Sequence, residues 1–288
     1  MNSNEDETAG TGATSSPHDR HHAERRRARR DAAKAARGGH ADDRLYLYGI
    51  HAVRHALENP QRNKIRLLAT KNALTRLELD PQLLASLAVE EALPRQLDQL
   101  VGTDAVHQGV VLETRPLVPA RLGDLGNSNL LLALDQVTDP HNVGAMLRSA
   151  IAFDAGAVIT TSRHSPAQSG VLAKAASGAL DMIDLIEVRN LTEALEELSG
   201  LGYATIGLDS EGEAELEAVA DSAAKGSGKI ALVVGAEGKG LRQKTRATCA
   251  ALARLDMPGA IKSLNVSNAA ALSLYVARRA LERGGKVS

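Results

Sequence analysis

Two polar side chains able to bind a ligand follow the apolar run at 130–135. Asp139 is a typical N-cap and Pro140 a typical first helical residue, so Asn142 lies in the first turn of a helix expected over 141–153. Arg148 comes six residues later, about 600° around an ideal helix, which turns the two side chains about 120° apart. They therefore need not share one ligand, and each alone could be an ordinary helix-start or surface residue.

A carboxylate follows the second long apolar run, Ile230-Ala-Leu-Val-Val-Gly235. Glu237 stands just beyond the expected end of this buried strand, and open α/β sheets bind their ligands at that edge. The same pattern also describes an ordinary glycine-rich loop with an exposed glutamate.

The third group is the run Ser263-Leu-Asn-Val-Ser267, at the start of the last expected helix, 265–283. Ser263 or Asn265 can cap this helix, a role worth about 1 kcal/mol. Because the helix is apolar nearly all round in its first three turns, we expect it to be buried, against a second subunit if not within the chain.

Several familiar chemistries lack their motifs. The loop 235–240 reads G-x-x-G-x-G, which is not the dinucleotide fingerprint G-x-G-x-x-G. The stretch 226–229 resembles the end of a phosphate-binding loop but lacks its hydroxyl residue and first glycine, and there is no G-x-S-x-G nucleophile elbow. A single cysteine, Cys249, excludes an internal disulfide and a cysteine-based zinc site, and we expect no metal.

Strands and helices that position these groups alternate from residue 130 onward. Alternation of this kind predicts an α/β fold with a mainly parallel sheet covered on both faces. The expected strands are 130–135, 157–160, 184–188, 205–209, 229–235 and 253–257, and the expected helices are 141–153, 167–178, 191–200 and 265–283.

The chain divides into four parts by composition. Residues 1–43 form a polar tail, 44–117 a small α/β domain with strands at 65–70 and 109–114, 118–129 a linker rich in turn residues, and 130–288 the main domain. No stretch is apolar enough to cross a membrane and no secretory signal is present, so we expect a cytoplasmic protein.

Charge and aromatic content limit the partners. The formal net charge of −1 hides a basic arm at 20–37. This arm contains eight Lys and Arg residues and two acidic residues, Glu24 and Asp31, which gives it a local net charge of +6. Such an arm either attracts RNA or keeps the protein in solution, and both interpretations stay open. Only 2% of the residues are aromatic, which argues against base-stacking modules.

Taken together, three segments resemble the motifs of the SpoU/TrmH branch of the SPOUT RNA methyltransferases. They are LDQVTDPHNVGAMLRSA, ALVVGAEGKGL and MPGAIKSLNVS, in this order, and the first unit, from YLYGIHAVRHAL to HQGVVLE, resembles that branch's substrate-binding domain. The resemblance covers about 44–284. It implies a sheet with a C-terminal trefoil knot, a homodimer, and S-adenosylmethionine as cofactor.

The resemblance also assigns roles to residues. Gly235, Leu255 and Leu264 match the cofactor-binding positions. Arg148 matches the arginine at the ribose 2'-hydroxyl, where we expect orientation and charge stabilisation because an arginine stays protonated. The remaining matches order the site and the RNA: Asn142, Glu237, Asn265, Ser263 and Ser267.

The function implied by the resemblance is methyl transfer to a ribose 2'-hydroxyl of RNA, with a guanosine of 23S rRNA favoured. Two alternatives remain: a tRNA 2'-O-ribose methyltransferase, or an RNA-binding homologue that has lost catalysis. The separate domain at 44–117 favours rRNA over tRNA, and the intact motif residues argue against the inactive homologue.

Overall fold

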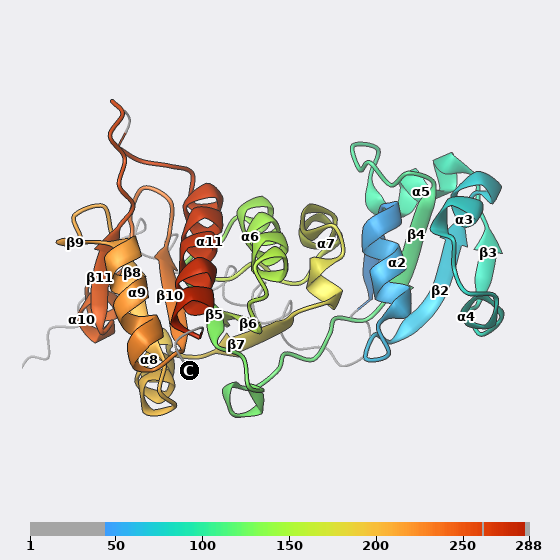
Figure 1. Ribbon diagram of the computed structural model, residues 1–288. Helices are drawn as coiled ribbons and strands as arrows, with labels where there is room; N and C mark the ends of the chain where they lie inside the picture. The colour runs from blue at the N-terminus through green and yellow to red at the C-terminus, as the bar shows by residue number, and fades with distance from the viewer. Residues whose placement is uncertain (1–43, 261, 286–288) are drawn as a thin grey trace, which may run out of the picture. The chain divides into compact units, whose positions relative to one another are not determined.

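The larger of the two described sheets has seven strands, and every neighbouring pair in it is parallel (Figure 1). The computed structural model describes residues 44–260 and 262–285, and the arginine-rich stretch 20–37 lies outside them. The strand order is β7-β6-β5-β10-β8-β11-β9. The strands are β5 (Leu130–Asp135), β6 (Ala157–Thr161), β7 (Asp184–Val188), β8 (Ala204–Leu208), β9 (Ala214–Glu215), β10 (Ile230–Gly235) and β11 (Ala251–Arg254).

Continuous apolar runs explain the two central strands. Every residue of β5 and β10 is buried, as expected for strands covered on both faces. Alternate residues belong to different hydrophobic clusters: Leu132 packs in one and Leu131 in the other, because successive side chains of a strand point to opposite faces. The register pairs Gly235 with Asp135, so both strands end side by side at the same edge.

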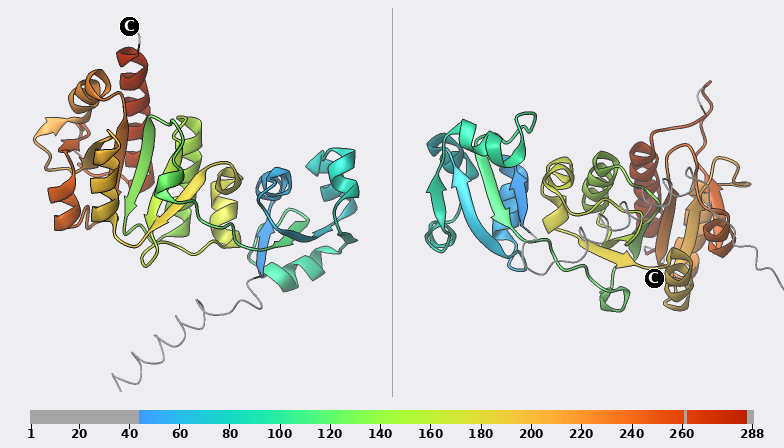
Figure 2. Two further views of the ribbon diagram at one scale, coloured as in Figure 1. Left: turned by 90° about the horizontal axis from the view of Figure 1, so that it is seen from below. Right: turned by 180° about the vertical axis from the view of Figure 1, so that it is seen from behind.

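Helices cover both faces of this sheet. Those on the first face are α6 (Pro140–Ala152), α7 (Gly170–Ala176), α9 (Leu216–Gly226) and α11 (Val266–Gly284), and those on the second are α8 (Leu191–Gly200) and α10 (Gln243–Thr248). Figures 1 and 2 show α6, α11 and α9 side by side. Gly144 allows α7 to approach α6 closely, since a Cβ there would lie 2.7 Å from the amide nitrogen of Ala176.

A second, four-stranded sheet lies in the N-terminal part of the described chain, with strand order β1-β4-β2-β3. Its strands are β1 (Leu45–Tyr48), β2 (Lys64–Ala69), β3 (Val89–Glu91) and β4 (Val110–Thr114). Its helices are α2 (Ile50–Glu58), α3 (Lys71–Leu77), α4 (Pro81–Ala85) and α5 (Pro94–Val101). Two 3₁₀ turns lie further along the chain, at Leu122–Asp124 before β5 and at Ala179–Asp181 between α7 and β7. Among the described residues, no helix is both long and apolar enough to span a membrane.

The structure confirms the predicted parallel sheet and shifts some of the predicted elements. The strand expected at 253–257 is β11 at Ala251–Arg254, because its ladder with β8 ends at Ala253. The helix expected at 167–178 starts only at Gly170, where Ser169 caps it. Helix α9 was not expected, since its buried stripe consists largely of alanine and gives little hydrophobic periodicity.

Helix α11 is only partly buried within one chain, so burial of its remaining face against a second subunit stays a prediction. Its buried face includes Ala270, Leu274 and Ala277, but Leu272 and Tyr275 are 48% and 51% exposed. The two exposed residues are three positions apart and therefore share one face of the helix.

Candidate active site

A chain of hydrogen bonds joins the three sequence segments at the carboxyl edge of the large sheet. The side-chain amide of Asn265 donates to the side-chain oxygen of Asn142 over 3.1 Å, and the Asn142 amide donates to Glu237 Oε2 over 3.3 Å. Ser267 Oγ donates to Asn265 Oδ1 over 2.6 Å. Four of the predicted site residues therefore form one polar network.

Helix caps fix two members of this network. Asp139 accepts a hydrogen bond from the amide of His141 and caps α6, which holds Asn142 in the first turn as predicted. Asn265 caps α11 by accepting from the amide of Ser267 over 2.9 Å. The same side chain thus satisfies a helix terminus with its oxygen and reaches Asn142 with its nitrogen, which places both helix starts at the site.

A tight turn after β10 presents Glu237. Ala236 and Gly240 form a β-bridge, and Gly240 has a positive φ of 62°. The turn folds so closely over Gly235 that a Cβ there would lie 2.1 Å from the carbonyl carbon of Gly240, so only glycine fits.

An ion pair anchors the far end of this turn. Asp135, fully buried at the end of β5, accepts from the backbone amide of Arg242 over 3.0 Å and from its Nε over 2.7 Å. The pair ties the end of β5, from which the chain leads into α6, to the turn that carries Glu237. Sequence reasoning missed both residues, although Asp135 ends a strand as recognisably as Gly235 does.

A cavity of about 280 Å³ opens beside Glu237. It is lined by the three predicted cofactor positions Gly235, Leu255 and Leu264, and also by Ser263. Two groups that sequence reasoning did not single out line it as well, Asp209 and Ser210, which directly follow β8. The rule that identified Glu237, a polar residue just beyond a buried strand, could have found Asp209.

Arg148 belongs to neither the network nor the cavity lining. It lies on the exposed side of α6 and makes no hydrogen bond or ion pair with the part of the chain that the structure describes. This placement agrees with the angle of about 120° between Asn142 and Arg148 around the helix.

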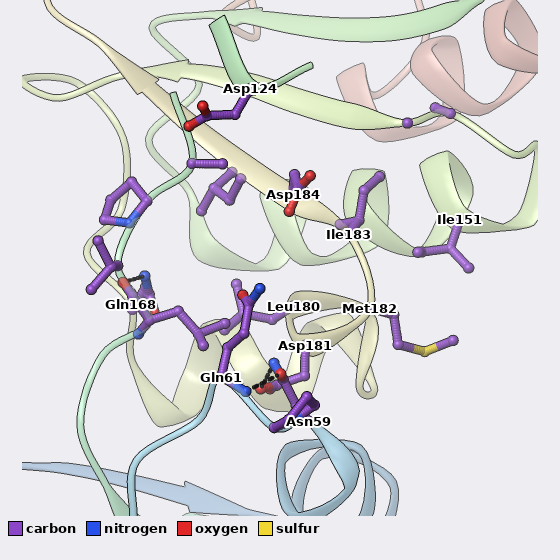
Figure 3. Close-up of a pocket in the computed structure, with 18 of the residues that line it drawn as sticks. Asn59, Gln61, Asp124, Ile151, Gln168, Leu180, Asp181, Met182, Ile183 and Asp184 are labelled. Carbon is purple, nitrogen blue, oxygen red and sulfur yellow. Dashed lines mark hydrogen bonds between the residues drawn. The ribbon is translucent and has the colours of Figure 1, made fainter. Parts of the chain in front are cut away.

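A larger hollow of about 790 Å³ lies elsewhere, at the amino ends of β6 and β7 (Figure 3). None of the predicted site residues lines it, and Asp124, Asp154, Asp181 and Asp184 do. Asp181 is already paired with Arg62 and Asn59. Carboxylates repel phosphate groups, and parallel sheets bind their ligands at the opposite, carboxyl edge, so the smaller cavity is the better candidate site.

Two features of the described residues concern metal binding and thiol reactivity. Within residues 44–260 and 262–285, no group of His, Cys, Asp and Glu could hold a metal ion. Burial, aided by the negative charge of Asp135, raises the pKa of Cys249 to about 12, so its thiol stays protonated and unreactive near neutral pH.

The fold and the site define a ligand-binding α/β protein whose polar residues gather at the carboxyl edge of a parallel sheet. Residues 129–275 match the model of the SpoU rRNA Methylase family, and residues 46–120 match the model described as RNA 2'-O ribose methyltransferase substrate binding. The chain therefore belongs to the SpoU rRNA methylase family. This confirms the resemblance drawn from the three motifs and the class of enzyme, an RNA 2'-O-ribose methyltransferase.

Relatives with similar sequences match nearly their whole length. The 23S rRNA (guanosine-2'-O-)-methyltransferase RlmB of Pseudomonas putida is 38% identical over 81% of this chain and 95% of the relative. The protein of the same name from Ralstonia nicotianae is 39% identical over 81% and 94%.

Solved structures share the fold. The SpoU methyltransferase AviRb from Streptomyces viridochromogenes aligns with a TM-score of 0.69 at 21% identity, covering 84% of this chain and 91% of that one. An AdoMet-bound rRNA methyltransferase from Sinorhizobium meliloti aligns with a TM-score of 0.69 at 22% identity, covering 82% and 87%.

Proposed function

We propose that this protein transfers the methyl group of S-adenosylmethionine to the ribose 2'-hydroxyl of a guanosine in 23S rRNA. The observation that carries the proposal is the network of Asn142, Glu237 and Asn265, which adjoins a cavity lined by the predicted cofactor positions. The names of the Pseudomonas and Ralstonia relatives support the choice of 23S rRNA and of guanosine.

The cavity suits the cofactor in chemistry as well as in position. Main-chain groups of the loops at Gly235, Leu255 and Leu264 would hold it, and a cavity of about 280 Å³ is close to the lower end of the usual range for ligand pockets, about 300–1,000 Å³. When bound, the cofactor supplies a methyl group that its sulfonium already activates. The protein then needs chiefly to bring the 2'-oxygen into line with that methyl group.

The polar residues divide this work. Asn142, Glu237 and Asn265 form a hydrogen-bonded amide and carboxylate surface that orients the ribose, and Ser263 and Ser267 extend it along the third segment. Arg148 orients the 2'-hydroxyl and stabilises the negative charge that grows on its oxygen, because its guanidinium remains protonated.

The proposal extends to the assembly. We assign residues 44–117 to RNA substrate binding, 118–129 to a linker and 130–288 to the methyltransferase domain with a C-terminal trefoil knot. The active form is a cytoplasmic homodimer. The exposed pair on α11, Leu272 and Tyr275, supports the dimer. The exposed position of Arg148 supports it as well, because a second subunit could place this arginine beside its own cavity.

Methyl transfer from radiolabelled S-adenosylmethionine tests the function. We expect label in an unmodified 23S rRNA transcript, mapped to the 2'-oxygen of one guanosine, and no label in tRNA transcripts. Label in tRNA alone would favour the tRNA methyltransferase. Cofactor binding without label in either RNA, or in rRNA of ribosomal precursors, would favour the inactive homologue and overturn the proposal.

A further inference from the structure

Asp209 occupies the position in the sheet that lies between the two cofactor-binding loops. It directly follows β8, and β8 is hydrogen-bonded to β10 on one side and to β11 on the other. Its backbone amide donates to the carbonyl of Ala253 over 2.9 Å, which fixes it beside the strand that leads to Leu255. Gly235 ends the other neighbouring strand.

The carboxylate of Asp209 is held in place rather than free in solvent. Only 8% of the side chain is exposed, Oδ1 accepts from the backbone amide of Glu211 over 2.9 Å, and Oδ2 is ion-paired with Arg246 of α10. A carboxylate offers about four acceptor positions, so these two partners leave roughly two for a ligand. Asp209 also lines the cavity, so a ligand bound there lies beside this residue.

Two carboxylates line the described part of the cavity, and they differ in their neighbours. Glu237 accepts from Asn142 and so belongs to the polar network next to β5. Asp209 follows the strand beyond β10 and therefore lies about one strand spacing, roughly 4.8 Å, further from β5. The methyl group must meet the RNA oxygen at the polar network of Asn142, Glu237 and Asn265. One of the two larger groups on the sulfur, the ribose or the methionine chain, therefore lies on the side of Asp209.

We propose that Asp209 accepts hydrogen bonds from the two adjacent hydroxyls of the cofactor's ribose, and that Arg246 positions its carboxylate. The inference rests on the proposed use of S-adenosylmethionine. The ribose is one carbon from the sulfur and presents two neighbouring donors, which match the two remaining acceptor positions of a fixed carboxylate. The ammonium group of the methionine part is the competing charged donor, and it lies on the other side of the sulfur from the ribose.

Calorimetric binding of S-adenosylhomocysteine and its deoxyribose analogues to the full-length protein separates these donors. For the unsubstituted protein we expect removal of one ribose hydroxyl to weaken binding roughly 10-fold or more, as for the loss of a hydrogen bond to a charged group. In Asp209→Ala, the parent ligand should bind roughly 10- to 100-fold more weakly, and removal of the same hydroxyl should then have little further effect.

Controls keep the result interpretable. Glu211→Gln changes an exposed carboxylate of the same loop that does not line the cavity and should bind like the unsubstituted protein. Arg246→Gln should weaken binding less than Asp209→Ala, because it only loosens the carboxylate. Asp209→Asn, which keeps the side-chain shape, provides a second variant if the alanine variant unfolds.

Each outcome bears on one proposal. If the unsubstituted protein binds neither S-adenosylmethionine nor S-adenosylhomocysteine, the proposed function fails. If it binds them but Asp209→Ala and Asp209→Asn keep the full penalty for the missing hydroxyl, the ribose assignment is wrong. It is equally overturned if these variants become insensitive to removal of the ammonium group instead.

Discussion

Asn265 donates a hydrogen bond of 3.1 Å to Asn142, although the two residues are 123 positions apart in the chain. Each stands at the start of a helix, Asn265 as the cap of α11 and Asn142 in the first turn of α6. Since the Asn142 amide donates onward to Glu237, the orientation of one amide fixes the other two groups. We therefore expect the three side chains of the candidate site to act as a unit rather than independently.

Substitutions at Asn142 and Glu237 should be strongly non-additive. Each single alanine variant removes the same hydrogen bond, so we expect each to lower kcat/KM for methyl transfer about 10- to 100-fold, and the double variant to lose little more than the worse single variant. Both side chains are at least partly exposed, so the free energy of unfolding should change by less than about 1 kcal/mol. Fully additive losses would contradict a shared role.

Arg148→Ala should abolish most methyl transfer while leaving cofactor binding nearly unchanged. The residue lies outside the cavity lining, and we expect a loss of about 100- to 1,000-fold in kcat, the usual effect of removing one group that stabilises an oxyanion. Arg148→Lys keeps the charge but not the planar donors and should recover only part of the activity. Single-turnover rates with saturating RNA measure the effect, and near-normal turnover in Arg148→Ala would remove it from the mechanism.

Sequence patterns predicted the larger sheet well because its strands are covered on both faces. The strand expected at 130–135 has those bounds as β5, and the strand expected at 229–235 is one residue shorter, at Ile230–Gly235. Short or small-residue elements were missed: α9 buries Ala220 and Ala224, which carry little hydrophobic signal, and β1 has only four residues. Local patterns also could not show where a strand stops pairing, so β11 was placed two residues too late.

The candidate site was predictable as a set of residues but not as a geometry. The motif resemblance indicated Asn142, Glu237 and Asn265. The cap rule left Ser263 and Asn265 as alternatives, and the structure shows that Asn265 caps α11. Which side chains meet depends on the register of β5 and β10 and on the packing of α11, information that no single segment contains. The strand-end rule could have indicated Asp135 and Asp209, but their ion pairs with Arg242 and Arg246 join residues that are distant in sequence and could not be predicted.

Asp135→Asn should destabilise the protein and loosen the turn that carries Glu237. The change leaves the Arg242 guanidinium without its buried anionic partner, but that side chain is 41% exposed, so we expect a loss of about 1–3 kcal/mol in the free energy of unfolding. Urea denaturation measures it. Asp221→Asn breaks the exposed pair with Arg283 and should cost less than about 1 kcal/mol, and equal effects of the two variants would show that the buried position of Asp135 is unimportant.

A charge on the exposed face of α11 should dissociate the proposed homodimer. Leu272 is 48% exposed in the single chain and would become buried between subunits, where an unpaired carboxylate is strongly unfavourable. We expect Leu272→Glu to sediment as a monomer at concentrations where the unsubstituted protein is a dimer. Val118→Glu, at a residue that is 90% exposed and distant in sequence, is the matched control, and a dimeric Leu272→Glu would exclude this face of α11 from the interface.

Cys249 should react with alkylating reagents only after unfolding. Burial, and to a lesser extent the charge of Asp135, raise its pKa to about 12, so the folded protein contains almost no thiolate at pH 8.5, whereas an unfolded chain with an ordinary thiol pKa contains a substantial fraction. Iodoacetamide labelling followed by mass spectrometry should therefore be far slower in buffer than in urea at the same pH.

The raised pKa of Cys249 also means that the unfolded chain binds fewer protons than the folded chain between about pH 9 and pH 12. Relative to Cys249→Ala, the free energy of unfolding should consequently fall as the pH rises through that range, by at most about 1.4 kcal/mol per pH unit. A difference between the two proteins that does not change with pH would show that the thiol titrates alike in the folded and unfolded states.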